Sequence, residues 1–192
     1  LDGVNYNNNT VWEGSILEGT SYSFYKRKPV GYQFISEATD MSKIDDESYD
    51  FVISSNCLEH SANPLKALKE WKRIIKDNGS LIIVLPKKDL NFDHKRQYTK
   101  FNKLLNAYRS DFDESNLDAL DEILEFHDVS RDCGIDNFED FKIRSTQNFQ
   151  NRCLHHYVYS KNLIEEMFLF VNLKLIDIGE TKHDYYAIAN KI

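Results

Sequence analysis

The sequence predicts an α/β fold built around parallel strands. Residues 32–36 and 49–55 are short stretches rich in aromatic and β-branched residues, as strands are. Residues 80–86 are almost continuously apolar, which is typical of a strand covered on both faces of a parallel sheet. Between the last two stretches, residues 64–75 repeat apolar side chains at helical spacing. A strand, a helix and a strand in succession predict a right-handed crossover between two parallel strands.

The central helix carries signals at both ends. Asn63 is a residue type that caps helices, and Pro64 follows at the first helical position, where its missing N–H costs nothing. Gly79 follows the last helical residues at the place where a C-terminal glycine cap is expected.

The second half of the chain is first helical and then returns to strands. Residues 87–152 are polar and charged, with apolar residues three and four apart and no strand pattern, so they predict a helical insertion. Ser160 opens another helix. Residues 173–180 and 184–191 predict two final strands. We expect one domain, 1–192, with the insertion at 87–152.

Composition excludes some partners. The 192 residues suffice for one domain with a sizeable core. The net charge of −7 disfavours nucleic acid and anionic membrane surfaces, because both prefer basic proteins. No apolar run approaches the roughly 20 residues that span a bilayer. The three cysteines lack a C-x-x-C unit, which favours a reducing, cytoplasmic location over a disulfide framework or a zinc site.

Polar side chains gather where the strand 49–55 ends. In open parallel sheets, ligands bind outside the carboxyl ends of the strands. A simple turn also explains serine and asparagine after a strand, so both interpretations stay open here. The residues concerned are Ser54, Ser55, Asn56, Glu59 and His60.

Residues 48–86 resemble the central segment of class I S-adenosylmethionine-dependent methyltransferases, in their type 11 branch. The shared pattern is a strand ending in serine, a Leu-Glu-His motif, a capped helix with E-x-x-R, and a strand ending in proline. The matching residues are Asp50, Val52, Ser54, Ser55, Leu58, Glu59, His60, Asn63, Pro64, Glu70, Arg73, Gly79, Leu81 and Pro86. The resemblance implies a Rossmann-like sheet with an antiparallel C-terminal strand, and S-adenosylmethionine as cofactor.

The resemblance also implies cofactor-binding residues. Glu37 would accept a hydrogen bond from the adenine amino group, and the backbone of Ala38 would serve the ring nitrogens. Asp2 would accept bonds from both ribose hydroxyls, as a carboxylate can. The cofactor's methionine end would lie against the strand-end residues Ser54, Ser55, Asn56 and His60. The family's first strand and Gly-rich loop would precede Asp2, so the chain resembles an N-terminally truncated member.

Basic residues in two polar stretches are candidates for the acceptor side. His94 is a candidate base and Arg96 a candidate acceptor-binding residue, in a loop that faces the acceptor in relatives. His155 or His156 is the alternative base; as neighbours in an extended segment they point to opposite sides. The planar fork of Arg152 suits phosphate or carboxylate. Solvated surface positions are the plainer interpretation of these charges. No metal site is expected.

The family branch implies a polar small-molecule acceptor. A sugar or a phosphorylated intermediate of surface-polysaccharide (capsule or O-antigen) biosynthesis fits the branch, with direct displacement as the mechanism. One alternative is a non-catalytic binding domain with an incomplete cofactor pocket. Another is a different α/β enzyme, such as a nucleotide-dependent oxidoreductase. The acceptor and the oligomeric state stay open.

Overall fold

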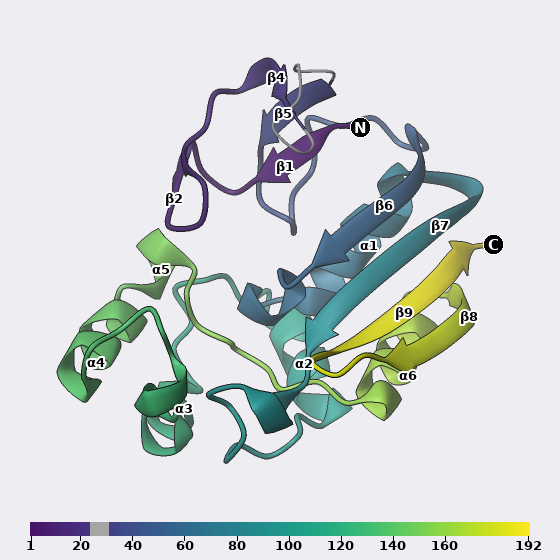
Figure 1. Ribbon diagram of the computed structural model, residues 1–192. Coiled ribbons are helices and arrows are strands. Elements are labelled where there is room, and N and C mark those ends of the chain that lie inside the picture. Colours follow the sequence, from purple (N-terminus) through teal and green to yellow (C-terminus); the bar gives the residue numbers. More distant parts are fainter. Residues whose placement is uncertain (24–30) are drawn as a thin grey trace.

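The computed structural model describes residues 1–23 and 31–192. Its main sheet has four strands, β6 (Tyr49–Ser55), β7 (Ile75–Pro86), β8 (Leu173–Glu180) and β9 (Asp184–Lys191), in the order β6-β7-β9-β8 (Figure 1). β6 and β7 are parallel, whereas β9 runs antiparallel to both β7 and β8. The predicted strand–helix–strand unit and the antiparallel C-terminal strand are confirmed.

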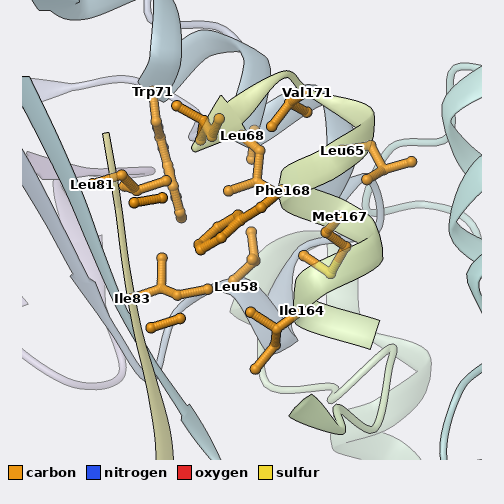
Figure 2. Packing of buried hydrophobic residues seen from close by; sticks show 14 of the residues in the cluster. Leu58, Leu65, Leu68, Trp71, Leu81, Ile83, Ile164, Met167, Phe168 and Val171 are labelled. Atoms are coloured by element: carbon orange, nitrogen blue, oxygen red, sulfur yellow. The ribbon is translucent and has the colours of Figure 1, made fainter. Parts of the chain in front are cut away.

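Helices α1 (Pro64–Ile74) and α6 (Lys161–Phe170) supply the core that covers one face of this sheet. Figure 2 shows Trp71 and Leu68 of α1 and Phe168 of α6 meeting Leu81 and Ile83 of β7. These side chains are almost fully buried. Each helix is capped as predicted, and the caps accept bonds from backbone N–H groups at 3.2 Å; the capping residues are Asn63 and Ser160.

The other face of the sheet is less covered by the described residues. Leu81 and Ile83 on β7 are buried, but Ile82 between them is only half-buried. On β6, Phe51 and Ile53 are exposed. The expectation that 80–86 is buried on both faces is therefore wrong for the part of the chain that the structure describes.

Gly79 does not cap α1, because the helix already ends at Ile74 and Gly79 lies inside β7. The pairing of β6 with β7 shifts register around Asp50, and Asn78 in this bulge takes the left-handed conformation with φ 62°. A Cβ at Gly79 would lie 2.7 Å from the carbonyl oxygen of Asp50. Glycine is therefore required here for a close backbone approach.

Residues 87–152 form a helical region without strands, as predicted, and the structure describes all of them. Its α-helices are α2 (Phe101–Arg109), α3 (Leu120–Phe126), α4 (Phe138–Thr146) and α5 (Asn148–Asn151). The 3-10 turn η3 (Lys88–Leu90) lies between β7 and α2, and η4 (Val129–Arg131) lies between α3 and α4. α2 packs on α1, and α3 and α4 share a second small core around Ile123, Phe141 and Leu154.

The first 35 residues contain strands that the sequence did not predict, apart from 32–36. A three-stranded sheet has the order β1-β5-β4, with β1 (Gly3–Asn5), β4 (Gly19–Tyr22) and β5 (Gly31–Ile35). β2 (Asn9–Thr10) and β3 (Gly14–Ser15) form a separate small hairpin. β1 is parallel to β5, so both strands end at the same edge. No described helix is long and apolar enough to cross a membrane.

Candidate active site at the strand ends

The end of β6 leads directly into the predicted polar motif. Ser55 is the last strand residue and donates a hydrogen bond to Oδ1 of Asn56. Asn56 takes the left-handed conformation, and its amide lies 3.4 Å from a carboxylate oxygen of Asp184. The side chains of Ser55 and Asn56 therefore support a turn. The 3-10 turn η2 (Leu58–His60) follows at once.

Cys57 follows the end of β6, and nearby charges affect its thiol. Cys57 keeps exposed surface, but the protein atoms around its thiol withdraw the thiol from water and raise its pKa to about 11. The charges of Glu59 and Glu37 add to this rise. A hydrogen bond with Ser54 opposes the rise. Glu37 stands two residues after the end of β5, and Ser54 belongs to β6. β5 and β6 belong to different sheets, so the joint role of Glu37 and Ser54 in cofactor binding stays a prediction.

Glu37 and Arg152, predicted for the cofactor and for the acceptor, contact each other. Nη2 of Arg152 donates to Oε1 of Glu37 at 2.5 Å. The guanidinium also lies 5.1 Å from the ring centre of Tyr6 and 4.9 Å from that of Phe149. Ala38 follows Glu37 and packs against the main core. The structure therefore joins the end of the insertion to the end of β5.

The structure separates Asp2 from this edge. Asp2 precedes β1, and its carboxylate accepts bonds from the Tyr32 amide at 2.7 Å and the Tyr49 hydroxyl at 2.6 Å. The Tyr49 hydrogen bond lowers the pKa of Asp2. Because β1 runs away from Asp2, the residue at its carboxyl end is Asn5, opposite Ile35. Assigning Asp2 to a ribose is wrong. Sequence reasoning did not consider Asn5, which the parallel register with β5 places at the carboxyl end of β1.

The segment 152–160 crosses over η2 and brings His155 to the site. The Tyr157 hydroxyl donates to the carbonyl oxygen of Ala62 at 2.7 Å, and the His156 amide donates to that of Glu59 at 2.9 Å. These bonds fix the position of the segment relative to the end of β6.

His155 lies beside η2 at the end of β6. Its Nδ1 lies 2.6 Å from Oδ2 of Asp93, and its ring centre lies 4.7 Å from the rings of His60 and Phe92. Burial lowers the pKa of His155, but the hydrogen bond and charge of Asp93 outweigh it, so the pKa is raised overall. Nδ1 of His60 lies 3.2 Å from the carbonyl oxygen of Leu154.

The surroundings of Glu59 and His60 shift the pKa values of these two side chains in opposite directions. Burial raises the pKa of Glu59 to about 7, although the charge of His155 opposes this. Burial, aided by the charge of His155, lowers the pKa of His60 to about 3. In both residues the neutral form is favoured, as expected for titratable groups withdrawn from water.

His94 and His156 lie outside this group. Nε2 of His94 lies 2.8 Å from Asp128, within the helical region. His156 is buried, with Nε2 3.1 Å from the Asn148 amide nitrogen. His156 therefore helps to hold α5, and its assignment as a base is wrong. His94 as a base stays a prediction, with Asp128 already bound to one ring nitrogen.

Arg96 is part of the folded scaffold. Its side chain is 1% exposed. Its guanidinium donates to Asp93 at 2.9 Å, to the carbonyl oxygens of His155 and His156 at 2.8 and 3.3 Å, and to Glu122 at 3.3 Å. All three of its nitrogens are occupied by protein groups, so the assignment of Arg96 to acceptor binding is wrong.

Comparison with known proteins points to methyltransferases. Residues 20–83 match a family described as "Methyltransferase domain". This stretch contains the ends of β5 and β6, the turn η2 and helix α1. The match covers about a third of the chain, in its first half, and leaves the helical region and the last two strands outside it.

Two uncharacterized proteins of Methanocaldococcus jannaschii are similar to parts of the chain. One is 36% identical over 62 residues, which is 30% of either chain. The other is 50% identical over 44 residues, which is 23% of this chain and 19% of that protein. The chain therefore aligns with less than a third of the length of these curated relatives.

A solved structure supports the fold. A SAM-dependent methyltransferase from Methanosarcina mazei is 13% identical, with a TM-score of 0.50 over 100% of this chain and 81% of that chain. The chain thus has the mixed α/β, Rossmann-like fold of methyltransferase structures.

Proposed function

We propose that the protein is an S-adenosylmethionine-dependent methyltransferase that acts on a polar small molecule. The observation that carries this proposal is that one segment, 152–160, contacts the residues that follow β5 and β6: Arg152 pairs with Glu37 after β5, and His155 packs on His60 of η2 after β6. Glu37 and η2 lie within the stretch that matches the methyltransferase domain family. Ligands of open α/β sheets bind outside the carboxyl ends of the strands.

The cofactor would bind across the ends of β1, β5 and β6. Asn5 lies at the end of β1 beside β5. Its side-chain amide would form a hydrogen bond with a ribose hydroxyl of an adenosine bound beside β5. Glu37 and Ala38 would contact the adenine. Ser54 and His60 would line the methionine end. The bound cofactor supplies an activated methyl group, so the chain's own task is to align it with the acceptor and exclude water.

His155 is the acceptor-side residue that the geometry favours. Asp93 holds Nδ1 of its ring, the ring lies 4.7 Å from that of His60 at the end of β6, and Nε2 is left for an acceptor. A base in this position takes a proton from an acceptor hydroxyl as the new bond forms.

An exposed aromatic side chain supports a sugar-like acceptor. Trp12 is 55% exposed, and its ring centre lies 5.1 Å from that of His60. A sugar ring is apolar on its faces and polar at its edges, so it suits an aromatic face that lies next to polar groups. We therefore extend the proposal to a sugar or phosphorylated intermediate of surface-polysaccharide biosynthesis, the class that the family branch implies.

Calorimetric titration with S-adenosylmethionine and S-adenosylhomocysteine tests the cofactor. We expect binding with one molecule per chain. Glu37→Gln should weaken it by about tenfold or more, since a hydrogen bond to a charged group contributes about 1.5–3 kcal/mol. Glu125→Gln, at an exposed position of α3, is the matched control and should bind as the wild type does.

The ion pair between Arg152 and Glu37 favours a second candidate, a non-catalytic binding domain. It occupies the carboxylate that would otherwise accept a bond from adenine. If neither cofactor form binds, the methyltransferase proposal fails and this candidate gains support. If both bind, transfer of a labelled methyl group to sugars and sugar phosphates is the next measurement.

A further inference from the structure

Three potential metal ligands converge beside the proposed acceptor site. One carboxylate oxygen of Glu59 and one ring nitrogen each of His60 and His155 all lie within 4.8 Å of one another. Glu59 and His60 come from η2 at the end of β6, and His155 comes from the segment 152–160. The fold thus brings together groups that are about 95 residues apart in the sequence.

In both imidazole rings, Nδ1 is held by a hydrogen-bond acceptor of the protein. Nδ1 of His155 faces the Asp93 carboxylate, and Nδ1 of His60 faces the carbonyl oxygen of Leu154. Carboxylate and carbonyl oxygens only accept hydrogen bonds, so they place the ring proton on Nδ1 and leave a lone pair on Nε2. A second ring nitrogen bound to a carboxylate or backbone carbonyl is the usual arrangement around metal-ligating histidines.

The third group, Glu59, lacks a partner for one of its oxygens. Its side chain is 1% exposed, and Oε2 has no hydrogen-bond partner among the described residues. Buried polar atoms in folded proteins are nearly always bonded, so such an atom requires an explanation. A cation shared with the two neighbouring imidazoles would supply the missing partner.

We propose that Glu59, His60 and His155 bind a divalent transition-metal ion of the zinc class. Imidazole nitrogens with one carboxylate suit zinc, cobalt or iron, whereas magnesium prefers oxygen ligands alone. Three protein ligands leave a position open for water or for an acceptor oxygen, which is the pattern of catalytic rather than structural zinc sites.

The ligand spacing requires closure of the site. Bonds of about 2.0–2.2 Å at tetrahedral angles place the ligand atoms of one ion roughly 3.4 Å apart. The most widely separated side chains must therefore approach by about 1.4 Å from the 4.8 Å spread, through rotation of the Glu59 carboxylate and the imidazoles. An ion here would occupy the same Nε2 of His155 that a base needs, so the two roles of His155 are alternatives.

Titration with Co²⁺ and Zn²⁺ tests the proposal. The protein is first treated with a chelator and then titrated with Co²⁺, which reports its ligands through its visible absorption. We expect one Co²⁺ per chain, displaced by Zn²⁺ and not by Mg²⁺. Glu59→Gln and His155→Asn should each weaken binding by more than about 100-fold, because loss of an outer partner alone costs about 10–100-fold. His183→Asn, an exposed histidine outside the cluster, is the matched control.

Glu59→Gln is the decisive variant because it removes no hydrogen bond of Oε2 and keeps the side-chain volume. Circular dichroism checks the fold of each variant. If Co²⁺ and Zn²⁺ do not bind, or if Glu59→Gln binds them as tightly as His183→Asn, the proposal is wrong. The result is separate from the cofactor titration, because metal binding and S-adenosylmethionine binding are read independently.

Discussion

Replacement of Arg96 by methionine should cost about 3–5 kcal/mol of folding free energy. The side chains of Arg96 and Asp93 are 1% and 4% exposed, and their ion pair spans 2.9 Å. Removing one partner of a buried pair leaves the other charge uncompensated, which typically costs about 3–5 kcal/mol. Arg96→Met also removes the donors to the carbonyl oxygens of His155 and His156. The expected loss therefore lies toward the upper end of this range.

Urea unfolding measures this loss. With a slope of about 2 kcal/mol per molar urea, the midpoint should fall by about 1.5–2.5 M. Arg131→Met is the matched control. Arg131 is 42% exposed and lies 3.8 Å from Asp128, and such surface pairs contribute only about 0–1 kcal/mol. If Arg96→Met lowers the midpoint no further than Arg131→Met does, the structural role of Arg96 is refuted.

Two further predictions concern packing and pH. Gly79→Ala should destabilise the protein by about 1–3 kcal/mol in the same urea assay, because the added Cβ would clash with the Asp50 carbonyl oxygen; an unchanged midpoint would contradict the close approach. Burial raises the pKa of Asp132, but bonds from His127 and Arg144 outweigh it and lower the pKa overall. A lowered pKa in the folded state means that this stabilisation is present above about pH 4 and is lost as the pH falls. The stability difference between wild type and Asp132→Asn should therefore shrink below about pH 4, and a constant difference down to about pH 2 would argue against the ion pair.

The sequence correctly predicted those helices and strands whose periodicity or capping residues are visible within a short stretch. β6 was predicted from 49 to 55 and occurs there, and β8 and β9 occur at their predicted bounds. The cap at Asn63 and the start of α1 at Pro64 are also confirmed. These elements are determined by periodicity and capping within a few residues, which a single sequence displays directly.

The sequence-based predictions were wrong where contacts between residues far apart in the sequence determine the structure. β1 is only three residues long and shows no strand pattern of its own; its pairing with β5 determines that Asn5, and not Asp2, ends the strand. Arg96 lies in a polar stretch typical of a solvated loop. In the structure it is buried and donates hydrogen bonds to backbone carbonyl groups about 60 residues away. Gly79 follows a helix in the sequence, but the bulge opposite Asp50 decides its role.

The buried pair of Asp93 and Arg96 links the stability of the fold to the geometry of the candidate site. An apolar pair of similar volume is often as stable as a buried ion pair, so burial alone does not explain these charges. Asp93 binds the ring of His155, while Arg96 binds both Asp93 and the His155 backbone. We infer that the pair fixes the direction of Nε2 of His155.

Arg96→Lys tests this positioning role, because lysine keeps the charge but lacks the planar fork that reaches several acceptors at once. Nitrogen NMR of the imidazoles should show a single Nδ1–H form of His155 in the wild type. In Arg96→Lys the protein should stay folded, and the His155 signals should shift or broaden while those of the exposed His183 stay unchanged. Unchanged His155 signals in a folded Arg96→Lys variant would mean that Asp93 alone orients the ring and that Arg96 serves only stability.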